Sequence, residues 1–119
     1  MQADAQRPLN LSHEYQLAFL ESQDFSTNQI VLKTGTILGQ ATANPNLLQL
    51  FGNVNANPPQ VLFSTPFTAG VFNNFAVTLD FTQKYVMLLS FSLVSSRDDI
   101  NRKAPSAPPK CSFRLETAL

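Results

Sequence analysis

The segment Phe75–Phe81 reads Phe-Ala-Val-Thr-Leu-Asp-Phe and has the clearest pattern in the sequence. Its odd-numbered positions are large and apolar, whereas its even-numbered positions are small or polar. Successive side chains of a β-strand point to opposite faces, so this period of two predicts a strand with one apolar face. Such a face must pack against a second layer, which makes this segment the starting point for predicting the fold.

Other segments of the same kind precede it, separated by clusters of Asn, Pro, Gly and Thr. No segment before residue 84 carries an apolar stripe of period 3.6 over three turns, as a helix would require. Short strands with turn residues between them are typical of a β-sandwich or jelly roll. Five or six strands are few for that architecture, so we expect an all-β, incomplete β-jelly roll or β-sandwich that is a piece of a larger domain. The expected strands are Ser12–Leu20, Asn28–Lys33, Leu47–Val54, Val61–Ser64 and Phe75–Phe81.

Composition excludes several classes of protein. The 119 residues include eight basic and eight acidic side chains, so the net charge is zero and a nucleic-acid partner is not expected. No apolar run approaches the about 20 residues of a transmembrane helix, so we expect no membrane partner either. A single cysteine, Cys111, and a single histidine, His13, provide neither an internal disulfide nor a metal cluster, and we expect no metal.

The character of the chain changes near residue 84. Residues 1–84 carry three basic and five acidic side chains, whereas residues 85–119 carry five basic and three acidic ones. We therefore predict a first unit at 1–84 and an unrelated, partly disordered tail at 85–119. Within the tail, Tyr85–Val94 is apolar enough for a strand or a short helix. From Ser95 onward we expect disorder, with at most a weak turn or helix near Phe113–Leu119.

The first expected strand carries the candidate catalytic chemistry. His13 and Glu14 are neighbours and must point to opposite faces, whereas Glu14 and Gln16 share a face that Ala18 extends. A carboxylate beside an amide suits sugar recognition, but a charged residue on the wet face of a sheet has the same appearance. Lys33 ends the next strand, where pairing would bring it near Glu14 and lower the pKa of that carboxyl group. A solvated charge at a strand end is the alternative for Lys33.

Other residues offer less. Cleavage of a glycosidic bond normally needs two carboxyl groups, and the other strand-borne acid, Asp80, lies 66 positions after Glu14 with nothing to place them together. Cys111 has no histidine nearby in sequence, which argues against a thiol nucleophile. Asn10-Leu11-Ser12 is a sequon for N-glycosylation, although such triplets also arise by chance.

Four blocks of the sequence resemble the catalytic domain of fungal glycoside hydrolase family 131. The likeness covers roughly residues 7–83 and keeps one order throughout. The blocks are fairly specific together and weak one by one; they are Arg7–Leu17, Val31–Thr36, Leu48–Pro59 and Leu62–Phe81.

The resemblance implies a secreted β-jelly-roll enzyme that cleaves β-glucans of cell walls, with β-glucan as its partner and no cofactor. It places a catalytic carboxylate on Glu14, and the strand pattern adds Gln16 and Lys33 as candidate substrate-binding residues. The family's second acid and its histidine come from regions that this sequence does not match, so we expect the fragment to be inactive by itself. A carbohydrate-binding β-sandwich without hydrolysis is the alternative. The resemblance implies an extracellular location, although the N-terminus lacks the apolar centre of a signal peptide; the oligomeric state stays open.

Overall fold

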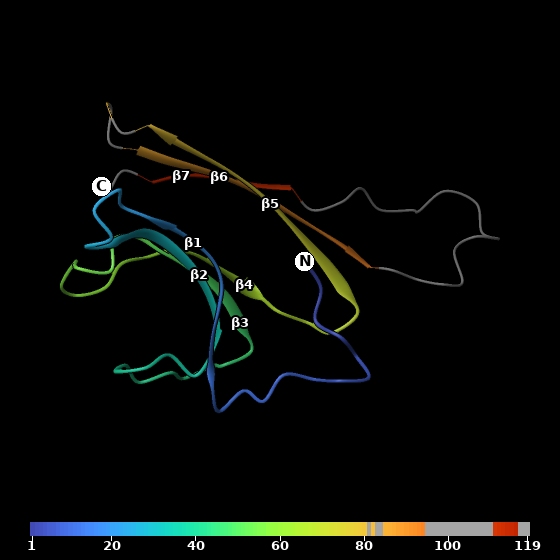
Figure 1. Ribbon diagram of the computed structural model, residues 1–119. Helices are drawn as coiled ribbons and strands as arrows, with labels where there is room; N and C mark the ends of the chain where they lie inside the picture. Colours follow the sequence, from blue (N-terminus) through green and yellow to red (C-terminus); the bar gives the residue numbers. More distant parts are fainter. Residues whose placement is uncertain (81, 83–84, 95–110, 117–119) are drawn as a thin grey trace.

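The structure, a computed structural model, describes residues 1–80, 82, 85–94 and 111–116. Its regular elements in these residues are all β-strands, so the predicted all-β class is confirmed, and no helix there is long and apolar enough to cross a membrane. The strands form two antiparallel sheets, which Figure 1 shows as separate layers. The four-stranded sheet contains β1 (Glu14–Glu21), β2 (Asn28–Gly35), β3 (Leu47–Phe51) and β4 (Val61–Pro66), and the three-stranded sheet contains β5 (Val71–Asp80), β6 (Tyr85–Val94) and β7 (Cys111–Glu116).

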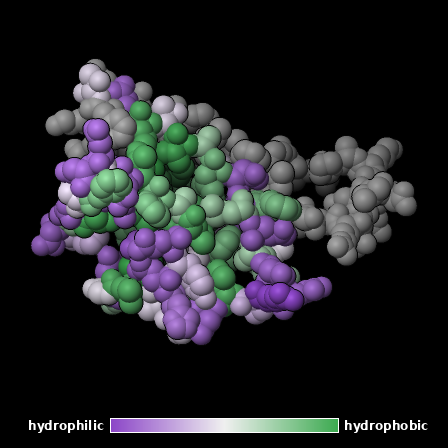
Figure 2. All heavy atoms as spheres, in the orientation of Figure 1, coloured by the Kyte–Doolittle hydropathy of each residue, from purple (hydrophilic) through white to green (hydrophobic). Residues whose placement is uncertain are grey.

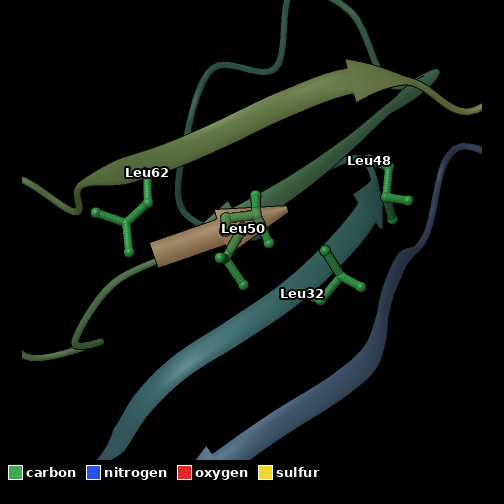
Figure 3. Packing of buried hydrophobic residues seen from close by; sticks show 5 residues of the cluster. Leu32, Leu48, Leu50 and Leu62 are labelled. Carbon is green, nitrogen blue, oxygen red and sulfur yellow. The ribbon is translucent and has the colours of Figure 1, made fainter. Parts of the chain in front are cut away.

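A leucine cluster between the sheets forms the core. Its buried members come from β2, β3 and β4 of one sheet and from β6 of the other, and Figure 3 shows how those of the first sheet point into a common space. Burial of one such side chain contributes about 1.5–3 kcal/mol, so this cluster is the main force that holds the layers together. The members are Leu32, Leu48, Leu50, Leu62 and Leu88.

Phe75 and Leu79 of β5 pack against this cluster, and Val77 lines the same space, so the predicted apolar face is confirmed for these three positions. The Phe75 ring meets the Phe63 ring edge to face, with the centroids 6.0 Å apart. Phe81, the fourth predicted member, lies outside the described residues.

Several predicted boundaries are wrong. β2 continues through Gly35, β3 ends at Phe51 and β5 begins at Val71, because pairing with a neighbouring strand fixes strand length more than local sequence does. Residues 85–94 form a strand and not a helix, and they pair with β5 over ten positions. The boundary near residue 84 and the unrelated origin of residues 85–119 stay predictions.

The expected disorder does not hold for residues 111–116. β7 pairs with β6 over all six of its residues, so this segment is a strand and not the weak turn or helix expected near Phe113. Its sequence, Cys-Ser-Phe-Arg-Leu-Glu, alternates apolar and polar residues strictly, which was a strand signal in its own right. Residues 95–110 and 117–119 lie outside the described residues.

A β-bulge in β1 corrects the predicted faces of that strand. Gln16 pairs with Lys33, but the register shifts before Ala18, which pairs with Leu32. Directly opposed residues share a face, so Gln16 lies on the outer face with Lys33, whereas Ala18 lies on the core face with Leu32. The prediction that Ala18 extends the face of Glu14 and Gln16 is therefore wrong. The bulge lets one strand present polar groups at its start and apolar groups to the core further on.

The space between the two sheets is open along one side. An apolar pocket of about 290 Å³ lies there, with Phe19 and Leu20 of β1 on one wall and Val77 of β5 on the other. Figure 2 shows apolar side chains at the surface in the middle of this view, with hydrophilic ones over the loops below. Met1 lies at the rim, where it exchanges two backbone hydrogen bonds with Asn73 of β5.

Candidate functional site

The outer face of the four-stranded sheet carries a row of polar side chains. Gln16 of β1, Lys33 of β2, Gln49 of β3 and Ser64 of β4 occupy directly opposed positions in the register. Opposed residues point to the same side, so the row crosses the whole sheet on the face turned away from the leucine core. It is here that the sheet combines charged and amide groups within one surface.

Glu14 stands at the β1 end of this row and accepts three hydrogen bonds. Lys33 Nζ lies 3.0 Å from Glu14 Oε1, and Gln16 Nε2 donates to the same oxygen at 2.9 Å. The backbone N–H of Leu38 donates to Oε2 at 2.9 Å. The structure therefore brings together all three residues that the sequence singled out for catalysis and binding, and the predicted proximity of Lys33 to Glu14 is confirmed.

The three donors determine the charge state of the carboxyl group. Burial raises the pKa of Glu14, because the side chain is only 6% exposed, but the hydrogen bonds from Gln16 and Leu38 and the positive charge of Lys33 outweigh it. The net result is a pKa below the ordinary 4.5, so Glu14 is ionised at neutral pH. A carboxylate in this state can act as a base or nucleophile, but it holds no proton to donate to a leaving group.

Lys33 is held from both sides. Its side chain is 15% exposed, its ammonium group pairs with Glu14, and the Phe51 ring centroid lies 5.5 Å from Nζ. An ammonium over an aromatic face is stabilised by the ring quadrupole. These contacts suit a residue that positions Glu14; the role of Lys33 in binding substrate stays a prediction.

Local backbone geometry places Leu38 beside Glu14. Gly35 has φ of +86°, and a Cβ atom at this position would collide with the carbonyl oxygen of His13. The amide of Thr36 donates to that same carbonyl at 3.1 Å, and the Thr36 hydroxyl donates to Leu11 O at 2.8 Å. The end of β2 is thus fixed against the segment before β1, which brings the loop beginning at Ile37 over the carboxylate.

That loop forms one wall of a second pocket, of about 290 Å³. Residues 37 and 40–44 line it together with Leu47, Gln49 and Phe51 of β3 and Val61 of β4. The pocket is next to the Glu14–Lys33 ion pair. Two of its lining residues neighbour Lys33: the Phe51 ring lies below the ammonium group, and Gln49 is the residue opposite Lys33 in the β2–β3 register. Sequence reasoning missed Gln49 and Phe51; the signal was a single polar residue in the run Leu-Leu-Gln-Leu-Phe, which marks the outer face of a buried strand.

Among the acidic side chains that the structure describes, none is placed beside Glu14 as a second carboxylate. Glu21 ends the same strand, about 23 Å away at 3.3 Å per residue, and Asp80 ends β5 in the other sheet. Asp4 accepts the Gln6 amide within the N-terminal segment. The paired carboxyl groups of glycosidases lie about 5–10 Å apart, so these residues provide one member of such a pair.

Asp24 stabilises the turn between β1 and β2. It accepts hydrogen bonds from the hydroxyls of Ser22 and Ser26 at 2.6 and 2.7 Å, and these bonds lower its pKa to about 2. The described residues also bring no three His, Cys, Asp or Glu side chains into one metal-binding group.

Asn10 lies exposed in the turn before β1. Its Oδ1 accepts a hydrogen bond from the hydroxyl of Ser12 at 2.8 Å and from the Ser12 amide at 3.2 Å. An exposed turn accommodates a bulky glycan, and glycosylation of Asn10 stays a prediction.

Two antiparallel layers packed around a leucine core define a β-sandwich, the architecture to which jelly rolls belong. The family model described as glycoside hydrolase 131 catalytic N-terminal domain matches residues 1–96, and the chain belongs to this family. The chain is also similar to the crystal structure of the catalytic domain of the glycoside hydrolase family 131 protein from Coprinopsis cinerea, with a TM-score of 0.61 and 23% identity. The match covers 98% of this chain and 38% of that one, so the chain spans well under half of that catalytic domain. No curated protein matches it.

Proposed function

We propose that this chain is the part of a secreted β-glucan hydrolase domain that holds the ionised member of its carboxylate pair, Glu14. The observation that carries the proposal is the set of three donors around a 6% exposed carboxylate, on the polar face of a family 131 sheet. In this role Glu14 acts as base or nucleophile, and Gln16 and Lys33 hold it in place and contact the sugar. The leaving-group oxygen then needs its proton from a second carboxyl group.

Because the described acids provide only one carboxylate at the site, the chain by itself is expected to bind β-glucan without cleaving it. The test is co-sedimentation with insoluble β-1,3-, β-1,4- and β-1,6-linked glucans, combined with an assay for released reducing ends. We expect retention on at least one glucan and no release. Glu14→Gln removes the charge and weakens retention, whereas Glu21→Gln, at the exposed far end of the same strand, is the matched control and leaves it unchanged. Release that Glu14→Gln abolishes would show an active chain, and absence of retention would refute the proposal.

The single carboxylate also fits a second function, a carbohydrate-binding module that never takes part in hydrolysis. The two functions differ in their preference for a positively charged ligand, because hydrolysis passes through a cationic, oxocarbenium-like transition state. A hydrolase site should therefore bind a cationic imino sugar more tightly than glucose, and Glu14→Gln should remove this preference. A binding module whose sugar site does not use the charge of Glu14 should bind both sugars alike with either residue at position 14.

A further inference from the structure

We propose that the pocket between the 37–44 loop and the outer face of β3 binds one neutral sugar ring, a single glucosyl unit of the glucan chain. The proposal rests on the proposed function and adds to it a place, a size and a charge preference. Three features of the pocket carry it: its volume, the polar groups that line it, and the ion pair that borders it.

The size suits a small ligand. Pockets for drug-sized molecules span about 300–1,000 Å³, and this one, at about 290 Å³, lies at the lower limit. Its floor is the outer face of β3, where Leu47, Gln49 and Phe51 point to the same side. Its wall is a loop that contains two alanines, Ala41 and Ala43, whose small side chains leave the space open. A single ring fills such a pocket, and a longer oligosaccharide must extend out of it.

The lining matches a sugar ring on both its polar and its apolar sides. Gln40, Asn44 and Gln49 provide amides, and Thr42 provides a hydroxyl group. Two of these groups are already oriented, because Asn44 Oδ1 accepts the Asn46 amide at 3.1 Å and Thr42 Oγ1 accepts the Ile37 amide at 2.9 Å. The acceptor sides are thus engaged in holding the loop, so the Thr42 hydroxyl proton and the Asn44 amide hydrogens are the groups that these two residues would offer to a ligand. Phe51 and Leu47 provide the apolar surface that the C–H groups of a pyranose need.

Charge decides which sugar fits. No Asp, Glu, Lys or Arg is among the residues that line the pocket. Lys33, which borders the pocket through Phe51 and Gln49, is already paired with Glu14 at 3.0 Å, so an anionic sugar gains no free counter-charge from it. A uronate would lose hydration of its carboxylate without compensation, which is costly. The pocket therefore favours a neutral hexose over the corresponding uronic acid.

The position connects the pocket to the carboxylate. Ile37 lines the pocket, and the next residue, Leu38, donates its backbone N–H to Glu14. A ring in the pocket is thus adjacent to the turn that covers Glu14, and a glucan chain that leaves the pocket in this direction passes over the ion pair.

The test is a titration of the ¹⁵N-labelled chain with cellobiose, laminaribiose, glucose and glucuronate, followed by amide chemical shifts. We expect the neutral sugars to shift amides of residues 37–51, and glucuronate to bind at least tenfold more weakly than glucose. Gln49→Leu should weaken binding about tenfold, whereas Gln23→Leu, in the exposed turn after β1, should leave it unchanged. Ala43→Leu fills the pocket from the loop and should also weaken binding, which keeps the test valid if the Gln49 variant does not fold.

The outcomes separate this proposal from the proposed function. Binding of neutral sugars with shifts confined to the surroundings of Gln16 would overturn the pocket and leave the function standing. Binding that neither Gln49→Leu nor Ala43→Leu changes would also overturn it. Equal affinity for glucose and glucuronate would overturn the charge preference, and no binding of any neutral sugar would overturn both proposals.

Discussion

Replacing Lys33 by Met tests whether the ion pair with Glu14 controls both stability and charge state. Exposed ion pairs contribute about 0.2–1 kcal/mol, whereas removal of one partner from a buried pair costs about 3–5 kcal/mol. The Glu14 side chain is 6% and the Lys33 side chain 15% exposed, but both residues are only half-buried as a whole, which places the pair between these limits. The carboxylate keeps two donors, Gln16 and the Leu38 amide, after the substitution. We therefore expect the free energy of unfolding at pH 7 to fall by about 1.5–3 kcal/mol, the range for a hydrogen bond to a charged group.

The sign of the pH dependence follows from the lowered pKa of Glu14. A carboxyl group whose folded-state pKa lies below its unfolded value stabilises the protein above the unfolded value, here near 4.5, and loses this contribution as pH falls through the folded pKa. The difference between wild type and Lys33→Met should thus be largest near pH 7 and shrink below about pH 4.5. In the variant, the pKa of Glu14 should be higher than in the wild type, which ¹³C NMR of the carboxyl carbon measures directly.

Urea denaturation of wild type, Lys33→Met, Glu14→Gln and the double variant completes the measurement as a double-mutant cycle. A coupling energy above about 1 kcal/mol at pH 7 that shrinks as the pH falls below about 4.5, through the lowered pKa of Glu14, is the expected result. A coupling energy near zero at pH 7, or a Glu14 pKa unchanged by Lys33→Met, would refute the reasoning and leave the pair as a solvated surface contact.

Three further predictions concern the backbone, the core and the surface. Gly35→Ala should destabilise the fold more than Gly39→Ala, because both residues have positive φ but only the Cβ at Gly35 meets another group, the His13 carbonyl; thermal melts of the two variants make the comparison. Leu48→Ala should lower the free energy of unfolding by about 2–5 kcal/mol in urea titration, because the side chain is fully buried. Expression of the chain behind a secretion leader should give a product whose mass falls on treatment with peptide N-glycosidase, and Asn10→Gln should remove this shift, since Asn10 begins the one N-x-Ser/Thr sequon of the sequence.

The sequence predicts the strands well where one strand has two distinct faces. The alternation from Phe75 onward identifies β5 and its apolar face, and the pairing of the first two strands follows from their order and brings Lys33 to Glu14. These features are local or depend on neighbouring strands, so short-range reasoning is sufficient. The start of β5 at Val71 is different, because it depends on pairing with β6, more than ten residues later.

The remaining errors concern backbone geometry, which side-chain patterns do not encode. The bulge after Gln16 moves Ala18 to the core face, and nothing in the residues around position 17 announces it. The pocket needs a loop near position 40 to fold over β3, and the third donor to Glu14 is a backbone amide, which has no sequence signature. Sequence patterns therefore predicted the side-chain part of the site, and the backbone part became visible only in the folded chain.

The ion pair need not be present for stability. Removing both ions of a buried pair from water costs free energy. Replacing both partners by apolar groups of similar size is therefore often neutral or stabilising. We therefore expect the double variant Glu14→Met/Lys33→Met to unfold within about 1 kcal/mol of the wild type, although each single charge removal is destabilising. The same double variant should lose retention on β-glucan, measured by co-sedimentation beside the Glu21→Gln control. If the double variant is much less stable than the wild type, the pair is a structural element of the sheet. If it is stable and still retained on glucan, the outer face does not bind sugar through Glu14.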